Sequence, residues 1–234
     1  QCFENKPRLF DPDSSPRAWY FYKNLYFSGK LEFLKGFDLE HLISNEKPYE
    51  RLQAKILGSD SKLGDKFKLA GDTDFNFNED KYSKFWKILI KDRDFDEHLI
   101  KLQNCHKRHH NLINFSLMPV TGSLNNFKGR GYDRFDTFIY DLNDYYLSKD
   151  MKEIDSKIRN YRKDSPNYQY RNYFLDQFKD VYDYCRNVYF IDGDFVDRLI
   201  EHGSKVIESK EDVIRYMDDA LDYWKIKVDT IRSF

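Results

Sequence analysis

Aromatic side chains recur at helical spacing through much of this chain, and this pattern constrains the fold more than any other feature. The sequence holds 20 Phe and 18 Tyr among 234 residues. Each such ring buries roughly 150–250 Å² in a core, so a few large side chains can fill the interior. We expect one globular domain over residues 1–234, of the α+β class and mainly helical, with aromatic-rich helices packed around a few short strands. A subregion of short strands at 1–77, followed by a helical remainder at 78–234, is an option within it.

The order of the elements follows from caps, breakers and the period of the apolar side chains. Pro16 favours a helix start, and Ser209 followed by Asp212 has the pattern of a capping box. The helices that we expect span residues 16–28, 78–103 with a break near 92–96, 133–147, 151–162, 168–189 and 209–231. Residues 31–70 suit short strands or loops, 114–120 indicate a buried strand, and Asp192-Gly193 predicts a turn in a hairpin or loop at 190–196.

The charge balance and the cysteine pattern limit the class of protein. Lys and Arg number 39 and Asp and Glu 40, so contact with nucleic acid would need a local basic patch. Cys2, Cys105 and Cys185 are odd in number and far apart, which favours the cytoplasm over a disulfide framework. No run reaches the roughly 18 apolar residues of a membrane span, and no segment is typical of a signal peptide. Because the chain lacks an initiator Met, we expect that it begins inside its reading frame.

Three histidines, His106, His109 and His110, lie within five residues of the chain. Imidazole is the commonest transition-metal ligand and the usual general base, so the cluster indicates a metal or catalytic site. The alternative is a solvated helix end, where His and Lys side chains interact favourably with the C-terminal end of the helix dipole. His109 and His110 are the candidates for a catalytic base.

A polar loop at residues 122–131 combines three glycines, amide side chains and two cations. Such a loop can hold phosphate through backbone N–H groups together with Lys128 and Arg130, while Asn125 orients the ligand. Its spacing differs from that of the glycine-rich phosphate-binding motifs. The alternative is a structural loop, in which Gly permits positive φ and Asn caps neighbouring backbone groups.

Two carboxylates three residues apart, Asp133 and Asp136, flank Arg134 at the start of the next expected helix. The helix dipole alone favours carboxylates at such a position. Together with the two cations of the loop they could instead form a polar cluster, in which Asp133 and Asp136 bind Mg²⁺ or Mn²⁺ and Arg134 binds phosphate. The other paired aspartates are more typical of turns: Asp72, Asp74, Asp192 and Asp194.

The pattern NxxNFxLMPxxGxLNNxKGxxxDRFDxFIxxLxxYY spans Asn111 to Tyr146. It resembles that of a broad group of uncharacterised bacterial proteins of similar length. The segments FDPDSSP and FKLAGDTDF and the closing helix are similar as well, so the resemblance covers most of the chain. It implies a bacterial protein and no particular mechanism.

A narrower resemblance runs to the second half of the HNH-type nuclease modules of modification-dependent restriction enzymes. It rests on a strand with Asn114, Phe115 and Leu117, followed by Asn125 in a loop. That family implies a metal-bound phosphate attacked by water that a histidine activates. The matching residues here would be His109 or His110 as the base, Asn114 and Asn125 beside it, and Asp133 or Asp136 on the metal. The chain departs from the family in its acidic-residue-plus-His pair, since the similar pairs are Glu40-His41, far upstream, and Glu97-His98, in an expected helix.

These observations together predict a bacterial intracellular protein that binds or cleaves nucleic acid or nucleotide phosphates, in phage defence or as a toxin. An alternative is a non-catalytic protein–protein interaction module with exposed Tyr and Phe as its partner surface. A third is a small-molecule sensor with an aromatic pocket.

Overall fold

A computed structural model defines the fold. It describes residues 16–26, 38–42, 53–57, 68–91, 95–119, 134–150 and 174–233. Most of these residues are helical, and the strands form a small antiparallel sheet beside a large cluster of aromatic side chains. The expected mainly helical α+β class is therefore confirmed. The helix predicted at 151–162 lies outside the described residues.

Four antiparallel strands form the sheet, in the order β1-β2-β3-β4. They are β1 (Asp38–Leu42), β2 (Gln53–Leu57), β3 (Lys68–Thr73) and β4 (Phe115–Pro119). The buried strand predicted at 114–120 is confirmed, because the side chains of residues 115–118 are all buried. Gly71 pairs with Leu117, so the sheet joins the strand-rich N-terminal stretch to the helical remainder.

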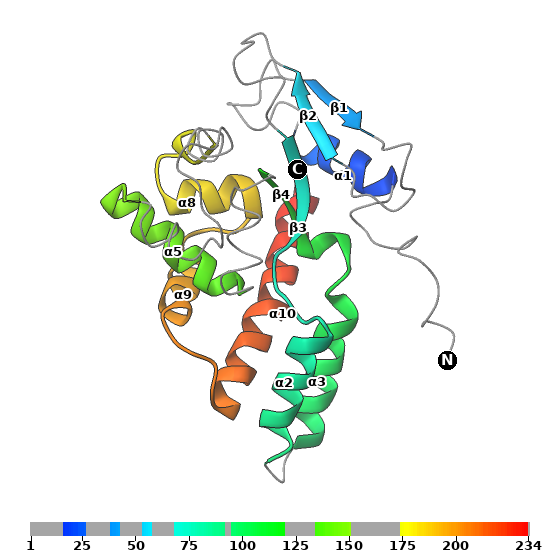
Figure 1. The fold of residues 1–234 in the computed structure, drawn as a ribbon, viewed down its shortest axis with the longest axis vertical. Helices are drawn as coiled ribbons and strands as arrows, with labels where there is room; N and C mark the ends of the chain where they lie inside the picture. The colour runs from blue at the N-terminus through cyan, green and yellow to red at the C-terminus, as the bar shows by residue number, and fades with distance from the viewer. Residues whose placement is uncertain are drawn as a thin grey trace.

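The structure also defines seven α-helices and two short helical turns. They are α1 (Pro16–Tyr26), α2 (Glu79–Leu89), α3 (Phe95–Arg108), the 3₁₀ turn η3 (Leu112–Asn114), α5 (Phe135–Ser148), α8 (Val181–Tyr184), the π-helical turn η4 (Cys185–Tyr189), α9 (Gly193–Gly203) and α10 (Lys210–Arg232). Figure 1 shows α10 along the middle of the molecule, with α2 and α3 on one side, α5 and α9 on the other, and the sheet at one end.

Local sequence signals set the ends of several helices. The side chain of Asn78 accepts a hydrogen bond from the backbone N–H of Lys81 at 3.0 Å and caps α2. Ser209 and Asp212 form the predicted capping box at the start of α10, where each side chain accepts from the other's backbone N–H, at 3.1 and 3.0 Å. Such caps satisfy N–H groups that have no partner inside the helix.

Aromatic rings from distant segments form the centre of the core. The ring of Phe75 lies 5.0 Å from that of Phe135, 5.2 Å from that of Tyr216 and 5.4 Å from that of Tyr223, measured between centroids. Separations of roughly 4.5–7 Å are the favourable range for aromatic pairs. The cluster therefore ties the segment after β3, the start of α5 and the middle of α10 together.

One lysine is buried completely beside this cluster. The Lys227 ammonium group on α10 lies 2.9 Å from a carboxylate oxygen of Asp74, and both side chains are 0% exposed. It also donates to the Phe115 carbonyl at 3.0 Å, to the Ser116 hydroxyl at 2.8 Å and to the Tyr223 hydroxyl at 2.9 Å. Both hydroxyls in turn donate to the same carboxylate oxygen of Asp74, so the buried ammonium group is paired with a carboxylate that two further hydrogen bonds stabilise.

The helix α9 corrects one expectation. We predicted a turn at Asp192-Gly193 within a hairpin or loop at 190–196, but α9 begins at Gly193. Its buried side chains, Phe195, Val196 and Leu199, share one face at helical spacing. Burial of that face outweighs the tendency of an Asp-Gly pair to form a turn.

Within the described ranges, no helix is both long and apolar enough to cross a bilayer.

Candidate functional site

A cavity of about 380 Å³ lies between α2, α5 and the segment that joins α9 to α10. Its size is near the lower end of the range for small-molecule pockets, roughly 300–1,000 Å³. Three stretches of the chain line it: Lys81, Lys84 and Phe85 on α2; Arg134, Thr137, Tyr140 and Asp141 at and within α5; and residues 203–207. The cavity thus depends on the packing of elements that are far apart in sequence.

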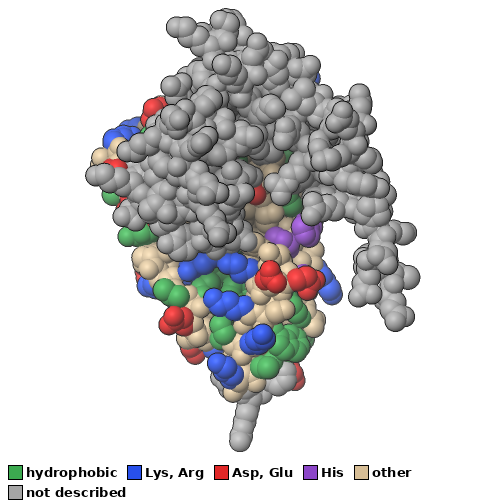
Figure 2. Space-filling model, viewed as in Figure 1, with side chains coloured by type: hydrophobic (Ala, Val, Ile, Leu, Met, Phe, Trp, Pro, Cys, Tyr) green, Lys and Arg blue, Asp and Glu red, His purple; other side chains and the backbone are tan. Residues whose placement is uncertain are grey.

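Among the charged side chains of the lining, cations outnumber carboxylates. Lys81, Lys84, Arg134 and Lys205 border the cavity, whereas Asp141 is the one carboxylate among its described lining residues. Lys81 and Lys84 are three residues apart on α2 and so project from one face of that helix. Figure 2 shows Lys and Arg side chains gathered over the helices below the part drawn in grey. In a chain of balanced charge, such a local patch can attract an anionic ligand.

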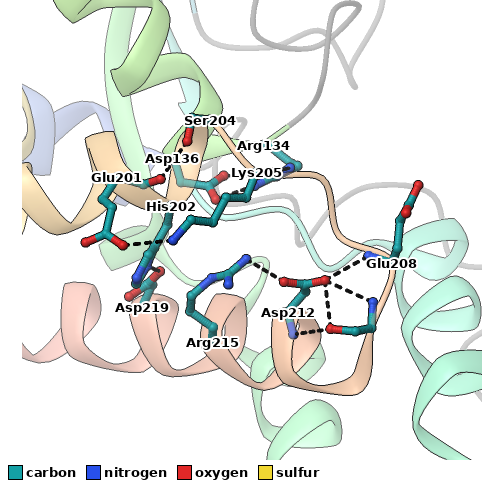
Figure 3. A network of polar contacts seen from close by, with 11 residues as sticks. Arg134, Asp136, Glu201, His202, Ser204, Lys205, Glu208, Asp212, Arg215 and Asp219 are labelled. Atoms are coloured by element: carbon teal, nitrogen blue, oxygen red, sulfur yellow. Dashed lines mark hydrogen bonds and ion pairs between the residues drawn. The ribbon is translucent and has the colours of Figure 1, made fainter.

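Arg134 precedes the first residue of α5 and joins two elements (Figure 3). Its Nε and Nη2 atoms donate to the two carboxylate oxygens of Asp136, at 3.1 and 2.5 Å. Its Nη1 atom donates to the Lys205 carbonyl at 2.7 Å and fixes the α9–α10 segment against α5. A guanidinium has five N–H donors, so these contacts with described residues leave two. Arg134, which we predicted to bind phosphate, therefore borders the cavity, and these contacts do not use two of its N–H donors.

Asp136 lies beneath Arg134 and is 1% exposed. Besides the guanidinium of Arg134, it accepts a hydrogen bond from the backbone N–H of Thr137 at 2.9 Å. Protein donors thus compensate the buried carboxylate, as a buried charge requires. The metal-binding role predicted for Asp136 stays a prediction.

Close backbone contact between α9 and α5 forms one wall of the cavity. A Cβ atom on Gly203 would lie 2.2 Å from the carbonyl oxygen of Asp136, so only glycine fits at this position without movement of the backbone. The Thr137 hydroxyl donates to the carbonyl of Gly203 at 3.1 Å. These two contacts hold the end of α9 against the first turn of α5.

A second polar cluster lies next to this wall and connects α9 to α10 (Figure 3). His202 Nδ1 lies 2.6 Å from one carboxylate oxygen of Asp219, and Arg198 Nε lies 3.2 Å from the other. Burial raises the pKa of Asp219, while its hydrogen bond with His202 and the charge of Arg198 oppose that rise. The cluster fixes α9 in place, so that residues 203–205 are held at the cavity.

Asn114, a predicted catalytic residue, is buried and occupies a different part of the molecule. Its Nδ2 atom donates to the carbonyls of Phe75 and His109, at 2.8 and 2.9 Å. Its Oδ1 atom accepts from the Phe75 N–H at 2.9 Å and from Trp224 Nε1 at 2.8 Å. All four hydrogen-bonding positions of the amide are therefore used to join η3, the segment after β3 and α10.

The two histidines predicted as bases differ in exposure. His109 is 5% exposed, and its Nδ1 atom accepts from the Phe77 N–H at 3.2 Å. His110 is exposed, with its ring centroid 4.4 Å from that of His109. Neither lines the cavity. His106, Lys107 and Arg108 form the last turn of α3, where positive charge is favoured by the helix dipole.

Four predicted site residues lie outside the described residues: Asn125, Lys128, Arg130 and Asp133. Across the part of the chain that the structure describes, no group of three or more His, Cys, Asp or Glu side chains is placed to hold a metal ion. The Mg²⁺ or Mn²⁺ site predicted from Asp133 and Asp136 stays a prediction.

Most of the lining residues were missed by sequence reasoning. Lys81 and Lys84 follow a recognisable helix cap, but two lysines at this spacing are equally typical of a solvated helix face. Asp141 falls in the predicted helix at 133–147, and the sequence does not indicate that its side chain is 3% exposed. Lys205 lies in the short segment after a helix that was not predicted. Arg134 is common to the predicted site and the cavity.

No protein-family model, no curated protein and no solved structure matches this chain. A functional assignment therefore depends on the chemistry of the cavity and of the residues around it.

Proposed function

We propose that this protein binds the phosphate group of a nucleotide in the cavity between α2, α5 and the α9–α10 segment. The observation that supports this function is the set of four cations around about 380 Å³ of space. Charged N–H groups form short, strong hydrogen bonds with phosphate oxygens, and two donors of Arg134 remain for them. The size favours a single nucleotide over a duplex, which would need an extended groove.

The exposure of the aromatic side chains gives less support to a partner-binding module. Every described Tyr and Phe side chain is buried or half-buried. Among the residues that the structure describes, the exposed large hydrophobic side chains are aliphatic and come from separate elements: Ile90, Ile100, Leu147 and Val206. Scattered apolar residues of this kind are common on protein surfaces.

Further parts of the expected function go beyond binding. Cleavage of a nucleic acid by His109 or His110 stays a prediction, as do an intracellular location and a role in phage defence or as a toxin. The nucleotide proposal does not depend on any of them.

The test is calorimetric titration of the full chain with nucleoside monophosphates, repeated with Lys84→Gln. We expect binding that weakens as salt is added, and roughly tenfold weaker affinity for the variant, which loses one charge-assisted contact. The matched control is Lys87→Gln, which makes the same charge change on an exposed residue of the same helix that does not line the cavity.

Two outcomes would contradict the proposal. One is the absence of nucleotide binding at low salt. The other is affinity that Lys84→Gln leaves unchanged but Lys128→Gln or Arg130→Gln abolishes, which would place the phosphate site on the 122–131 loop.

A further inference from the structure

Helix α2 carries lysines along one face beyond the two that line the cavity. Lys81, Lys84 and Lys87 follow one another at intervals of three residues, so they lie within roughly 120° of the helix circumference. Lys91 follows two residues after the end of α2, next to the helical cap residue Ile90. At a rise of about 1.5 Å per residue, this lysine row from Lys81 to Lys91 extends roughly 15 Å. Lys81 and Lys84 border the cavity, whereas Lys87 and Lys91 do not.

The lysine row is open to solvent. The side chains of Lys84, Lys87 and Lys91 are exposed, and that of Lys81 is half-buried. Within the described part of the chain, no carboxylate forms an ion pair with Lys84, Lys87 or Lys91, and the carboxylates of α2 are confined to its first turn. In Figure 2, Lys and Arg side chains continue from the part drawn in grey toward the lower end of the molecule, over the helices.

The lysine row is not explained by the stability of α2. The helix dipole favours a cation only in the last turn, where Lys87 lies. Like charges three or four residues apart repel one another and destabilise a helix. A ligand with several negative charges along the row would remove this repulsion.

The spacing of the charges favours a nucleic-acid strand as that ligand. Each nucleotide adds one negative charge, about 3.4 Å along the axis of a stacked strand, so the lysine row can face about four successive phosphates. A Lys ammonium group contacts phosphate as a point charge and does not read the base. A nucleotide in the cavity would thus be one unit of a strand whose backbone follows α2.

The cavity favours a single strand over a duplex. A space of about 380 Å³ suits one nucleotide, and a paired nucleotide would have to leave its stack and its partner before it could enter. Proteins that bind single strands combine a cationic surface along the backbone with aromatic side chains against which the bases pack. Tyr140, which is half-buried, is such a side chain in the lining.

We propose that this protein binds single-stranded nucleic acid, with one nucleotide in the cavity and the backbone of its neighbours along the lysine row. This inference rests on the proposed function, because the same cavity holds the phosphate of that nucleotide.

The test compares nucleoside monophosphates with single strands of about ten nucleotides, oligo(dT) and oligo(U), on the full chain and on the double variant Lys87→Gln with Lys91→Gln. The strands should bind the wild type more tightly, with affinity that falls more steeply with salt. Because the double variant lacks two phosphate contacts, it should bind the strands roughly ten- to thirtyfold more weakly at about 0.1 M salt, and the slope of log affinity against log salt should be smaller by about 1.4. Its affinity for monophosphates should be unchanged, since neither lysine lines the cavity.

The matched control is the double variant Lys179→Gln with Lys225→Gln. It makes the same charge change at two exposed lysines outside α2. Strand affinity and its salt slope should stay as in the wild type. An equal loss in this control would show that net charge alone attracts the strand, and would overturn the proposal.

The outcomes separate this inference from the proposed function. Strand binding that Lys87→Gln with Lys91→Gln leaves unchanged, beside monophosphate binding that Lys84→Gln weakens, would overturn the inference alone. Equal affinity for a duplex of the same length, or for poly-glutamate of the same charge, would overturn it as well. Strand binding that needs Lys87 and Lys91 without any monophosphate binding would overturn the proposed function, and with it the place of a nucleotide in the cavity.

Discussion

The buried pair of Lys227 and Asp74 shows how much one residue can contribute to this fold. Lys227→Met would leave the carboxylate of Asp74 buried without its cation, and breaking a buried pair in this way costs about 3–5 kcal/mol of unfolding free energy. Urea unfolding monitored by circular dichroism measures this loss. In the double variant with Asp74→Asn, the total cost should be smaller than the sum of the single costs, because no unpaired charge remains.

A lysine–aspartate pair nearer the surface, Lys101 and Asp218, is the control for the buried pair of Lys227 and Asp74. Lys101 lies 2.7 Å from Asp218, with side chains 25% and 48% exposed. We expect Lys101→Met to cost less than about 1 kcal/mol, because exposed pairs are solvated and contribute little. Equal losses for Lys101→Met and Lys227→Met, or strictly additive costs for Lys227→Met and Asp74→Asn, would contradict a special role for the buried pair.

Single residues also show where prediction from sequence stops. Asp74 was predicted to be a turn residue, and it does lie in a bend directly after β3. Its partner, Lys227, is 153 positions away in the sequence, and no local pattern connects the two. The catalytic role predicted for Asn114 from its motif stays a prediction, and the motif did not indicate that its amide joins three segments of the core.

At the scale of elements, the stability that the capping box at the start of α10 contributes should depend on pH in the acidic range. Partial burial alone would raise the pKa of Asp212, but hydrogen bonds from Ser209 and Glu208 and the charge of Arg215 lower it to about 2. Because this folded-state pKa is below the ordinary value of 3.8, the carboxylate stabilises the fold above that pH and ceases to do so as pH falls through about 2. The capping box should therefore weaken within this acidic window.

The measurement is thermal unfolding of the wild type and of Asp212→Asn between pH 7 and pH 2. We expect the variant to be less stable by about 1 kcal/mol at neutral pH, the usual contribution of a cap, and the gap to close as the pH approaches 2. Glu211→Gln, which changes the neighbouring exposed residue in the same turn, is the control and should show a smaller gap. A gap for Asp212→Asn that is independent of pH would contradict the role assigned to this carboxylate.

Elements with strong local signals were predicted well, and elements defined by packing were not. The helix start predicted at 78 and the strand predicted at 114–120 each lie within one residue of α2 and β4 at those ends, and the capping box of α10 is where the sequence placed it. The helix α9 was missed because Asp192-Gly193 resembles a turn, although Phe195 and Leu199 are at helical spacing. The cavity could not be predicted, because it exists only when α2, α5 and the α9–α10 segment are packed together.

On the scale of the whole molecule, α10 connects the other parts of the described chain. Its Lys227 contacts the sheet through Phe115 and Ser116, and its Trp224 donates to Asn114. Asp219 binds α9 through His202, and helices α2 and α3 pack against α10 from the other side. Because many contacts converge on one helix, we expect the molecule to unfold as a cooperative unit.

Buried tyrosines make this cooperativity visible at alkaline pH. Burial raises the pKa of five tyrosines in particular: Tyr26, Tyr146, Tyr184, Tyr189 and Tyr223. In the unfolded chain these hydroxyls ionise near pH 10, so above that pH the folded state binds more protons and its stability falls as pH rises. Each of the five groups contributes about 1.4 kcal/mol per pH unit to this fall.

Tyrosinate absorbance and far-ultraviolet circular dichroism should therefore change together, in one steep step above pH 10, when the protein is titrated with base. Tyr184→Phe removes one of the buried groups and should make the step shallower without eliminating it. The contrary result would be a gradual rise of tyrosinate absorbance while the circular dichroism stays constant. It would mean that water reaches these tyrosine rings in the folded protein, and that the aromatic core does not make the molecule unfold as one unit.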